Sequence, residues 1–376
     1  KAKGNDNTLN VTLDNVNIKA KNDAALSVEG AGNTTITLKG DNTLTSDGQH
    51  AGLEHNEKDY YGREDTGKLT ITSGNENGRN TGSLTATGSG ASAGIGSVWN
   101  TGKVSNSGAG TIEITGGDIT AIGASDGAGI GSGTWATGET NITISGTAKI
   151  NARTDQGGAG IGSGDGSTGQ TTVTIKSGTI KNATGGNTGD GIGGGCDSKN
   201  ITVKIEGGTI EKAKGGDGYG SHDAGDGIHS DGKLTISGGT IGTAQGGNGT
   251  ISGGSGILGN TMEILAGTIQ KAIGGNASNG TGGSGIRSNG NGTLTIKGGK
   301  IEQATGGDSE KYGGSGIYSS SKLTISDSAT IGNAQGGKGK GKSGGSGIYS
   351  YGDLTISGGK IQKATGGAST DGNGGS

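Results

Sequence analysis

Short stretches of alternating apolar and polar residues recur along the chain. The commonest has the form Leu-Thr-Ile or a close variant, in which two apolar residues flank a polar one. It occurs at Leu69–Ile71, Ile142–Ile144, Val173–Ile175, Leu234–Ile236, Leu294–Ile296, Leu323–Ile325 and Leu354–Ile356. A period of two, rich in β-branched residues, predicts short strands that bury the apolar pair and expose the threonine.

Two further apolar signals accompany these stretches. One is an isoleucine that follows a glycine, here called the anchor, at Ile95, Ile130, Ile161, Ile192, Ile228, Ile257, Ile286, Ile317 and Ile348. Leu26 and Leu53 extend the anchor series toward the N-terminus. The other is an isoleucine with an alanine three residues later, at Ile180, Ile210, Ile241, Ile269, Ile301, Ile331 and Ile361. Each repeat therefore predicts three short strands.

Consecutive anchors from Ile95 onward are 29 to 36 residues apart, and glycines separate the three signals. Glycine suits the corners of a coil because it adopts positive φ without a steric penalty. The pattern predicts an all-β fold, a right-handed parallel β-helix (β-solenoid) with three short strands per coil of about 30 residues and about 11–12 coils. The handedness follows from the general preference for right-handed parallel crossovers.

Loop lengths indicate how the coils differ. The distance from anchor to second strand is 16 residues after Leu53, 11 or 12 after Ile192 and its two predecessors, and 5 to 8 from Ile228 onward. The distance from the third strand to the next anchor rises over the same boundary from 11 to between 16 and 18 residues. We therefore expect one solenoid domain over 1–376, with irregular coils at 1–90, a long loop after the anchor at 91–200 and a long loop before it at 201–376.

Composition narrows the class of protein. The chain has 93 glycines in 376 residues, no proline and 26% hydrophobic residues. Lack of proline excludes collagen, and the regular apolar positions argue against disorder. A net charge of −3 gives no reason to expect nucleic acid or an anionic membrane as partner. Cys196 is the only cysteine, no apolar run is long enough to insert into a membrane, and the opening "KAKGNDN" shows no signal peptide, as a mature or trimmed form would not.

A family resemblance adds an expectation about function. The run "LNVTLDNVNIKAKNDAALSVEGAGNTTITLKGDNTL", followed by "GKLTITSG", "GSLTATGSG" and "AGIGS", resembles bacterial carbohydrate-binding-domain proteins of the pectate-lyase-like superfamily. The later coils resemble the glycine-rich repeat arrays of Firmicutes cell-surface proteins. The resemblance implies a right-handed β-helix, an extracellular location at the cell surface, and polysaccharide as ligand.

The few aromatic residues give the first candidate site. Tyr60 and Tyr61 follow anchor Leu53, Trp99 follows Ile95 and Trp135 follows Ile130, so all four belong to one corner of consecutive coils. Flat amphipathic rings suit the faces of sugars, which offer C–H groups and hydroxyls together. We expect a carbohydrate-binding platform there. The alternative is that the rings cover coil backbone.

Two further sets of residues are candidates. His229, Leu258, Arg287, Tyr318 and Tyr349 each follow an anchor directly, so they would form an outward column that could line a secondary groove. Asp190 and Asp226 both lie two residues before an anchor in adjacent coils, which would place the carboxylates roughly 5 Å apart. That spacing suits Ca²⁺ ligation or, less well, glycoside hydrolysis. The alternative is that both simply accept hydrogen bonds from corner amides or tilt into solvent.

Two motifs carry no function. "GGKGKGKS" (336–343) matches the phosphate-binding P-loop, but a strand follows it where a P-loop requires a helix. "GGDGYGSHDAGDG" only partly matches Ca²⁺-binding nonapeptides, because neighbouring loops lack the aspartate.

The sequence thus favours an extracellular solenoid that binds glycan or presents an adhesive surface, without catalytic residues or a required cofactor. A rod or filament subunit assembling end to end, and a polysaccharide lyase or hydrolase, remain open alternatives.

Overall fold

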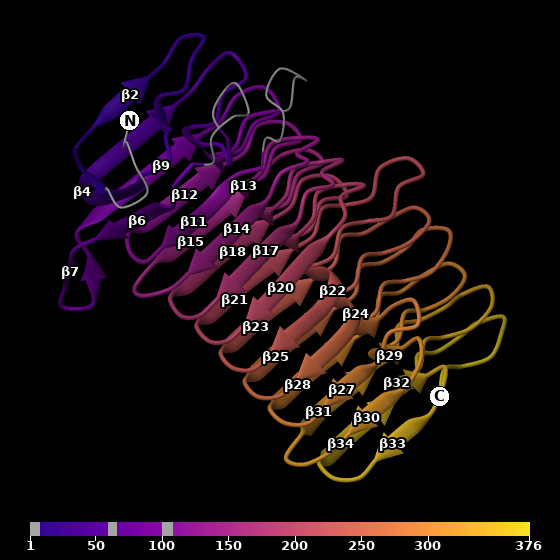
Figure 1. Cartoon of the computed structure of the whole chain (residues 1–376). Helices are drawn as coiled ribbons and strands as arrows, with labels where there is room; N and C mark the ends of the chain where they lie inside the picture. The colour runs from indigo at the N-terminus through magenta and orange to yellow at the C-terminus, as the bar shows by residue number, and fades with distance from the viewer. Residues whose placement is uncertain (1–7, 59–65, 100–107) are drawn as a thin grey trace. The chain divides into compact units, whose positions relative to one another are not determined.

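The structure, a computed structural model, describes residues 8–58, 66–99 and 108–376. It divides into two compact units, unit 1 with residues 1–189 and 193–201, and unit 2 with residues 190–192 and 202–376. Within each unit the strands of successive coils pair in parallel and in register (Figure 1).

Unit 1 contains three parallel ladders. The anchor ladder consists of β3 (Leu26–Val28), β5 (Leu53–His55), β10 (Ile95–Gly96), β13 (Ile130–Gly131) and β16 (Ile161–Gly162). The second ladder consists of β1 (Thr8–Asp14), the first part of β4 (Asn33–Thr45), β6 (Leu69–Ser73), β11 (Gly110–Ile114), β14 (Thr140–Ile144) and β17 (Thr171–Ile175). The third consists of β2 (Asn17–Lys19), the end of β4, β9 (Gly82–Thr87), β12 (Asp118–Ile122), β15 (Lys149–Arg153) and β18 (Thr179–Thr184). A small antiparallel hairpin joins β7 (Asn75–Glu76) and β8 (Arg79–Asn80).

Unit 2 repeats the arrangement. Its anchor ladder consists of Ile192 of β19 (Ile192–Gly193), β22 (Ile228–Ile236), β24 (Ile257–Ile264), β26 (Ile286–Ser288), β29 (Ile317–Ser319) and β32 (Ile348–Ser350). The second ladder runs from β20 (Ile201–Ile205) through the ends of β22 and β24 to β27 (Leu294–Ile296), β30 (Leu323–Ile325) and β33 (Leu354–Ile356). The third consists of β21 (Thr209–Lys214), β23 (Thr240–Gln245), β25 (Thr268–Ile273), β28 (Lys300–Thr305), β31 (Thr330–Gln335) and β34 (Lys360–Thr365).

The core of each unit is the interior of these ladders. In β27 and β30 the leucine and isoleucine are buried while the threonine between them is only half-buried, as the alternation predicts. Anchors such as Ile130 and Ile286 are fully buried. Burying an isoleucine stabilises a fold by about 1.5–3 kcal/mol, so a thin core with a few such residues per coil is sufficient.

The anchor strand differs between the units, and the difference explains the change in loops. In unit 1 the residue after the anchor is a glycine, and Gly96, Gly131 and Gly162 have φ of 133°, 136° and 142°. The chain therefore turns at once into a long loop, in a conformation that side chains rarely adopt. In unit 2 the equivalent residues, such as Arg287 and Tyr318, continue the strand and face outward. The long loop of unit 2 lies before the anchor instead, as between β28 and β29.

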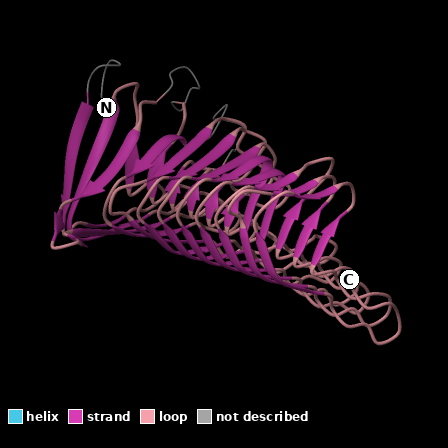
Figure 2. Cartoon of the chain, turned by 90° about the horizontal axis from the view of Figure 1, so that it is seen from below, coloured by secondary structure: helices cyan, strands magenta, loops and turns pink. Residues whose placement is uncertain are grey.

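The predicted all-β parallel β-solenoid is confirmed. Figure 2 shows strands and loops, and the described residues form no helix. There is accordingly no helix in the described ranges long and apolar enough to cross a membrane.

Candidate functional site

The corner after the anchor in unit 1 is built on buried serines. The backbone N–H of Gly133 donates to Ser97 Oγ at 3.0 Å, and that of Gly164 donates to Ser132 Oγ at 3.1 Å, in each case one coil back. Both serines are almost fully buried. Because these bonds repeat from coil to coil, they hold the start of each long loop in a fixed position.

Trp99 and Trp135 meet at this corner. Their ring centroids are 6.0 Å apart and the ring planes are inclined at 57°. The backbone N–H of Trp99 donates to Ser92 Oγ at 3.0 Å, and that of Trp135 donates to the carbonyl of Asp165 at 2.8 Å. Trp135 also has a positive φ of 56°, a conformation uncommon for a bulky residue. The backbone of the corner thus fixes both rings from below.

The two rings differ in exposure. Trp135 is 53% exposed, whereas Trp99 is partly buried and its indole Nε1–H finds no hydrogen-bond partner in the described part of the chain. The corner therefore offers an exposed aromatic surface beside an unsatisfied donor. Tyr60 and Tyr61, which we predicted to share this corner, lie outside the described residues.

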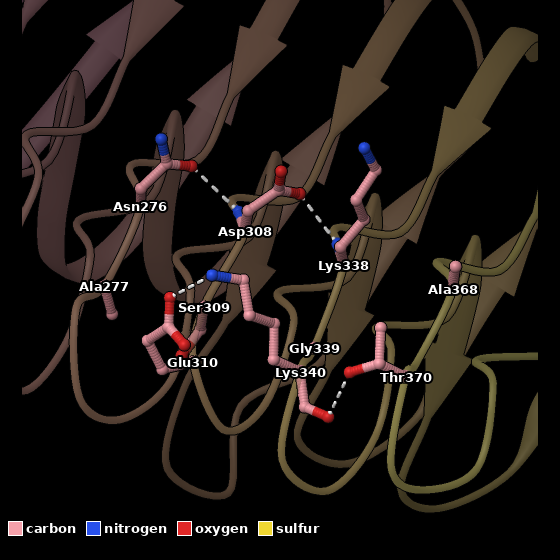
Figure 3. A pocket seen from close by; sticks show the side chains of 10 residues that line it. All are labelled: Asn276, Ala277, Asp308, Ser309, Glu310, Lys338, Gly339, Lys340, Ala368 and Thr370. Carbon is pink, nitrogen blue, oxygen red and sulfur yellow. Dashed lines mark hydrogen bonds and ion pairs between the residues drawn. The ribbon is translucent and has the colours of Figure 1, made fainter.

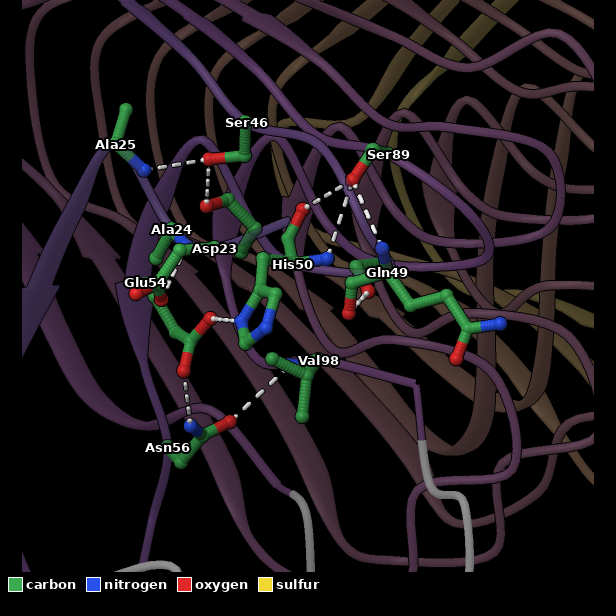
Figure 4. Close-up of polar contacts among 12 residues, drawn as sticks. Asp23, Ala24, Ala25, Ser46, Gln49, His50, Glu54, Asn56, Ser89 and Val98 are labelled. Atoms are coloured by element: carbon green, nitrogen blue, oxygen red, sulfur yellow. Dashed lines mark hydrogen bonds and ion pairs between the residues drawn. The ribbon is translucent and has the colours of Figure 1, made fainter. Parts of the chain in front are cut away.

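A polar network leads to the same corner from the preceding coil (Figure 4). His50 Nδ1 lies 2.7 Å from Glu54 Oε2, and Asn56 Nδ2 donates to Glu54 Oε1 at 3.1 Å. Asn56 Oδ1 in turn accepts the backbone N–H of Val98 at 3.1 Å, directly before Trp99. The hydrogen bond to Glu54 raises the pKa of His50 despite partial burial. The network was not foreseen, because its members are far apart in sequence.

His55 ties two successive coils together beneath the corner. Its Nδ1 lies 2.7 Å from the carbonyl of Ala109 and its Nε2 lies 2.8 Å from the carbonyl of Gly67. The side chain is fully buried, and burial lowers its pKa. A neutral imidazole has one N–H, so it can donate to only one of the two carbonyls. We interpret His55 as a structural residue.

The predicted outward column of unit 2 is present. Pairing registers place His229 beside Leu258, Leu258 beside Arg287, Arg287 beside Tyr318, and Tyr318 beside Tyr349. The rings of Tyr318 and Tyr349 stack with centroids 5.4 Å apart at 12°, and the Arg287 guanidinium lies 5.5 Å from the Tyr318 ring centre. Because these faces are covered by one another, the column presents mainly ring edges. It is less suited to stacking on sugars than the sequence implied.

Asp190 and Asp226 lie close together, as predicted, and both are nearly buried, at 5% and 8% exposure. Asp190 Oδ1 accepts the backbone N–H of Asp226 at 2.8 Å, and Asp226 Oδ1 accepts the backbone N–H of Ser255 at 2.5 Å. Each carboxylate thus bonds to an amide of the next coil, which was the structural alternative. Such burial is unfavourable for attack on a polymer.

The structure adds a histidine to this pair that the sequence analysis had placed in the outward column. His229 Nδ1 lies 2.8 Å from Asp190 Oδ2. Burial, followed by the charge of Asp190, raises the pKa of Asp226 to about 7. Burial alone would lower the pKa of His229, but Asp190 outweighs it and raises that pKa to about 10.

A hollow of about 380 Å³ lies among the long loops of unit 2 (Figure 3). Along it Asn276 Oδ1 accepts the N–H of Asp308 at 2.8 Å, and Asp308 Oδ1 accepts the N–H of Lys338 at 2.7 Å. Earlier coils continue the ladder through Asp217 and Asn248. Its sequence signal, an Asp or Asn after each Gly-Gly pair, was overlooked. The P-loop-like segment 336–343 belongs to this loop stack and leads to strand β32, as expected.

Comparisons with known proteins support the fold alone. A family model described as a beta helix repeat matches residues 112–134, 142–165, 173–196, 203–231 and 354–376. Each matched segment begins in the second strand of a coil, which is the Leu-Thr-Ile position. Neither the curated proteins nor the solved structures contain a match to the chain.

Proposed function

We propose that this β-solenoid is an extracellular cell-surface protein that binds polysaccharide or another glycan, and that the ligand rests on the unit 1 corner formed by Trp99 and Trp135. The observation that carries the proposal is the exposure of Trp135, 53%, on a backbone that holds it firmly. A large exposed ring on a rigid loop is costly in water and is expected where a ligand covers it.

The chemistry of the corner matches a sugar. The exposed face of Trp135 can pack against the C–H groups of a pyranose, and the buried Nε1–H of Trp99 is a donor in want of an acceptor. A sugar hydroxyl can supply that acceptor, since each hydroxyl has two lone pairs. The resemblance of the N-terminal coils to bacterial carbohydrate-binding-domain proteins supports the same class of ligand and the extracellular location.

Intrinsic fluorescence tests the proposal directly, because Trp99 and Trp135 are the only tryptophans. Titration with a panel of neutral and acidic oligosaccharides should change the emission for at least one of them. Trp135→Ala and Trp99→Ala should each weaken that binding by about 1–3 kcal/mol, the scale of central aromatic anchors. Tyr351→Ala, which removes a ring 77% exposed in unit 2, is the matched control and should bind as the parent does.

Two results would contradict the platform. The double variant of Trp99 and Trp135 could bind each glycan as tightly as the parent chain. Alternatively, it could lose many degrees of thermal stability, which would identify the rings as packing residues.

The last coil supports a second candidate, a rod that continues by stacking. Leu354 and Ile356 are 50% and 54% exposed, whereas Leu323 and Ile325, one coil earlier, are fully buried. A further coil, from the same protein or from a copy, would cover them and pair with β33. Light scattering of the chain at rising concentration tests association between copies. A stable monomer, with no filaments by electron microscopy, would exclude a copy as the covering partner.

A further inference from the structure

We propose that Asp190, Asp226 and His229 in unit 2 bind a single divalent metal ion of the zinc class. The inference concerns unit 2 and is independent of the proposed glycan site in unit 1. Each of the three residues offers one ligand atom, and these atoms lie within 4.8 Å of one another.

The fold brings the three side chains together through the anchor ladder. Ile192 pairs with Ile228, so Asp190, two residues before the first anchor, lies beside Asp226, two residues before the second. His229 follows Ile228 directly and turns its Nδ1 toward Asp190 Oδ2 at 2.8 Å. The ligands therefore come from two adjacent coils whose spacing the ladder fixes, and a site on such elements is more precise than one on free loops.

Asp226 has an oxygen available to a metal. Its Oδ1 accepts the amide of Ser255, while Oδ2 receives no hydrogen bond from any residue in the described ranges, although Asp226 is only 8% exposed. A carboxylate oxygen this buried normally has a partner, because burying an unpaired polar atom is costly. A cation held between Asp226 Oδ2, Asp190 and His229 would supply that partner.

The donor set indicates the kind of ion. Two carboxylates and one imidazole are the three-ligand set of an open zinc site, whose fourth position is taken by water or substrate. Ca²⁺ requires six to eight oxygen ligands, so the Ca²⁺ that the sequence suggested for Asp190 and Asp226 fits less well once His229 joins them. Imidazole with carboxylate suits Zn²⁺ and its first-row neighbours.

The surrounding charges favour a cation. Asp231 Oδ1 lies 3.5 Å from His229 Nε2, the arrangement by which a carboxylate orients a metal-bound histidine through its second nitrogen. The charge of Asp190 acts on the buried Asp226, and a divalent ion would relieve this repulsion. Arg287 is the nearby positive charge and acts against it only in part.

Binding requires one small rearrangement. Ligand atoms around a tetrahedral zinc are about 3.3 Å apart, so the 2.8 Å contact between His229 Nδ1 and Asp190 Oδ2 must open by roughly half an ångström, and the proton between them must leave. His229 is partly exposed, so the ion and the departing proton have a route to solvent. The next coils hold Ser255 and Leu258 at the equivalent positions, so we expect one ion per chain.

The test measures Zn²⁺ binding by calorimetry on the full chain in a Cys196→Ser background, because a thiol is itself a zinc ligand. We expect one ion per chain. Asp226→Asn, which retains the acceptor for the Ser255 amide but loses the charge, and His229→Gln should each weaken binding at least about tenfold. Asp223→Asn, an exposed aspartate of the same loop, is the matched control and should leave the affinity unchanged.

A second measurement does not depend on the variants folding. With ¹⁵N-labelled histidine, Zn²⁺ should shift the ring nitrogens of one of the four histidines of the chain, His229, in the parent protein. Failure of the parent to bind Zn²⁺ at millimolar concentration would overturn the proposal. So would unchanged affinity in folded Asp226→Asn, or shifts confined to other histidines.

Discussion

The indole of Trp135 lies directly on Gly166, one coil further along unit 1. A Cβ added at Gly166 would overlap Trp135 Cδ1, and Gly166 has a φ of 62°. Its backbone N–H donates to the carbonyl of Cys196 at 2.7 Å, which holds the glycine in place. The orientation of the exposed ring thus depends on the absence of a side chain at a residue 31 positions away.

Gly166→Ala should therefore displace Trp135 without removing it. We expect a changed tryptophan emission in the free protein and weaker glycan binding, together with a loss of stability of about 1 kcal/mol from the positive φ. Fluorescence and urea denaturation measure the two effects. Gly78→Ala is the matched control, because Gly78 has a φ of 78° and nothing within 4 Å of an added Cβ. It should cost similar stability and leave the emission unaltered; equal emission changes in both variants would contradict the contact.

A second prediction compares one ladder position in two adjacent coils of unit 2. Ile325 is fully buried and Ile356 is 54% exposed. Ile325→Ala should lower the free energy of unfolding by about 2–5 kcal/mol, since it leaves a cavity, whereas Ile356→Ala should cost less than about 1 kcal/mol. Urea denaturation checks both. Equal losses would show that another surface covers the last coil in solution, for example that of a second copy.

A third prediction concerns pH. The hydrogen bond to Glu54 raises the pKa of His50 above its usual 6.5, so the pair stabilises the fold fully below pH 6.5 and loses this contribution as pH rises through the folded pKa. Because His50 is partly exposed, the effect should stay below about 1 kcal/mol. Thermal unfolding between neutral and alkaline pH measures it.

Glu54→Gln should remove this decline, and Glu113→Gln, which alters an exposed ion pair with Lys68, should not. His55 does not interfere, because its pKa is lowered and its contribution changes only on the acid side. An unchanged pH profile in Glu54→Gln would refute the assignment.

A fourth prediction tests the Asp and Asn ladder of the unit 2 loops. Asn276→Ala removes the acceptor for the Asp308 amide, so exchange of that amide with solvent should accelerate and stability should fall by about 0.5–1.5 kcal/mol. Lys338→Ala is the control, since Lys338 joins the ladder through its backbone N–H and should retain that bond. Hydrogen exchange followed by NMR distinguishes the two. Equal protection of Asp308 in the parent and in Asn276→Ala would contradict the ladder.

Much of the fold was predictable because a solenoid is governed by local rules. Each coil buries the same few positions against its neighbours, so the anchors, the Leu-Thr-Ile strands and the small alanines could be assigned from their spacing. The corner change was readable too, since a glycine after the anchor, as at Gly131, allows a turn that Arg287 or Tyr318 does not favour.

The candidate sites were predictable only in part. Sequence spacing brought Trp99 near Trp135 and Asp190 near Asp226, because equivalent positions of adjacent coils must be neighbours. It could not tell which way a side chain turns within its coil. His229 was assigned to the outward column, yet its ring reaches back to Asp190 at 2.8 Å. The cost of leaving a buried carboxylate without a partner decides that orientation, and it depends on the surrounding structure.

The sequence alone determined the repeat, the parallel ladders and the residues that fill them, because these depend on periodicity and on interactions between equivalent positions. Only the tertiary structure decided which of the surface residues act together. The tilt of Trp99 against Trp135, the packing of Trp135 on Gly166 and the mutual stacking of Tyr318 and Tyr349 follow from contacts between side chains on different coils. Such contacts depend on rotamers and loop paths, which a repeating pattern leaves open.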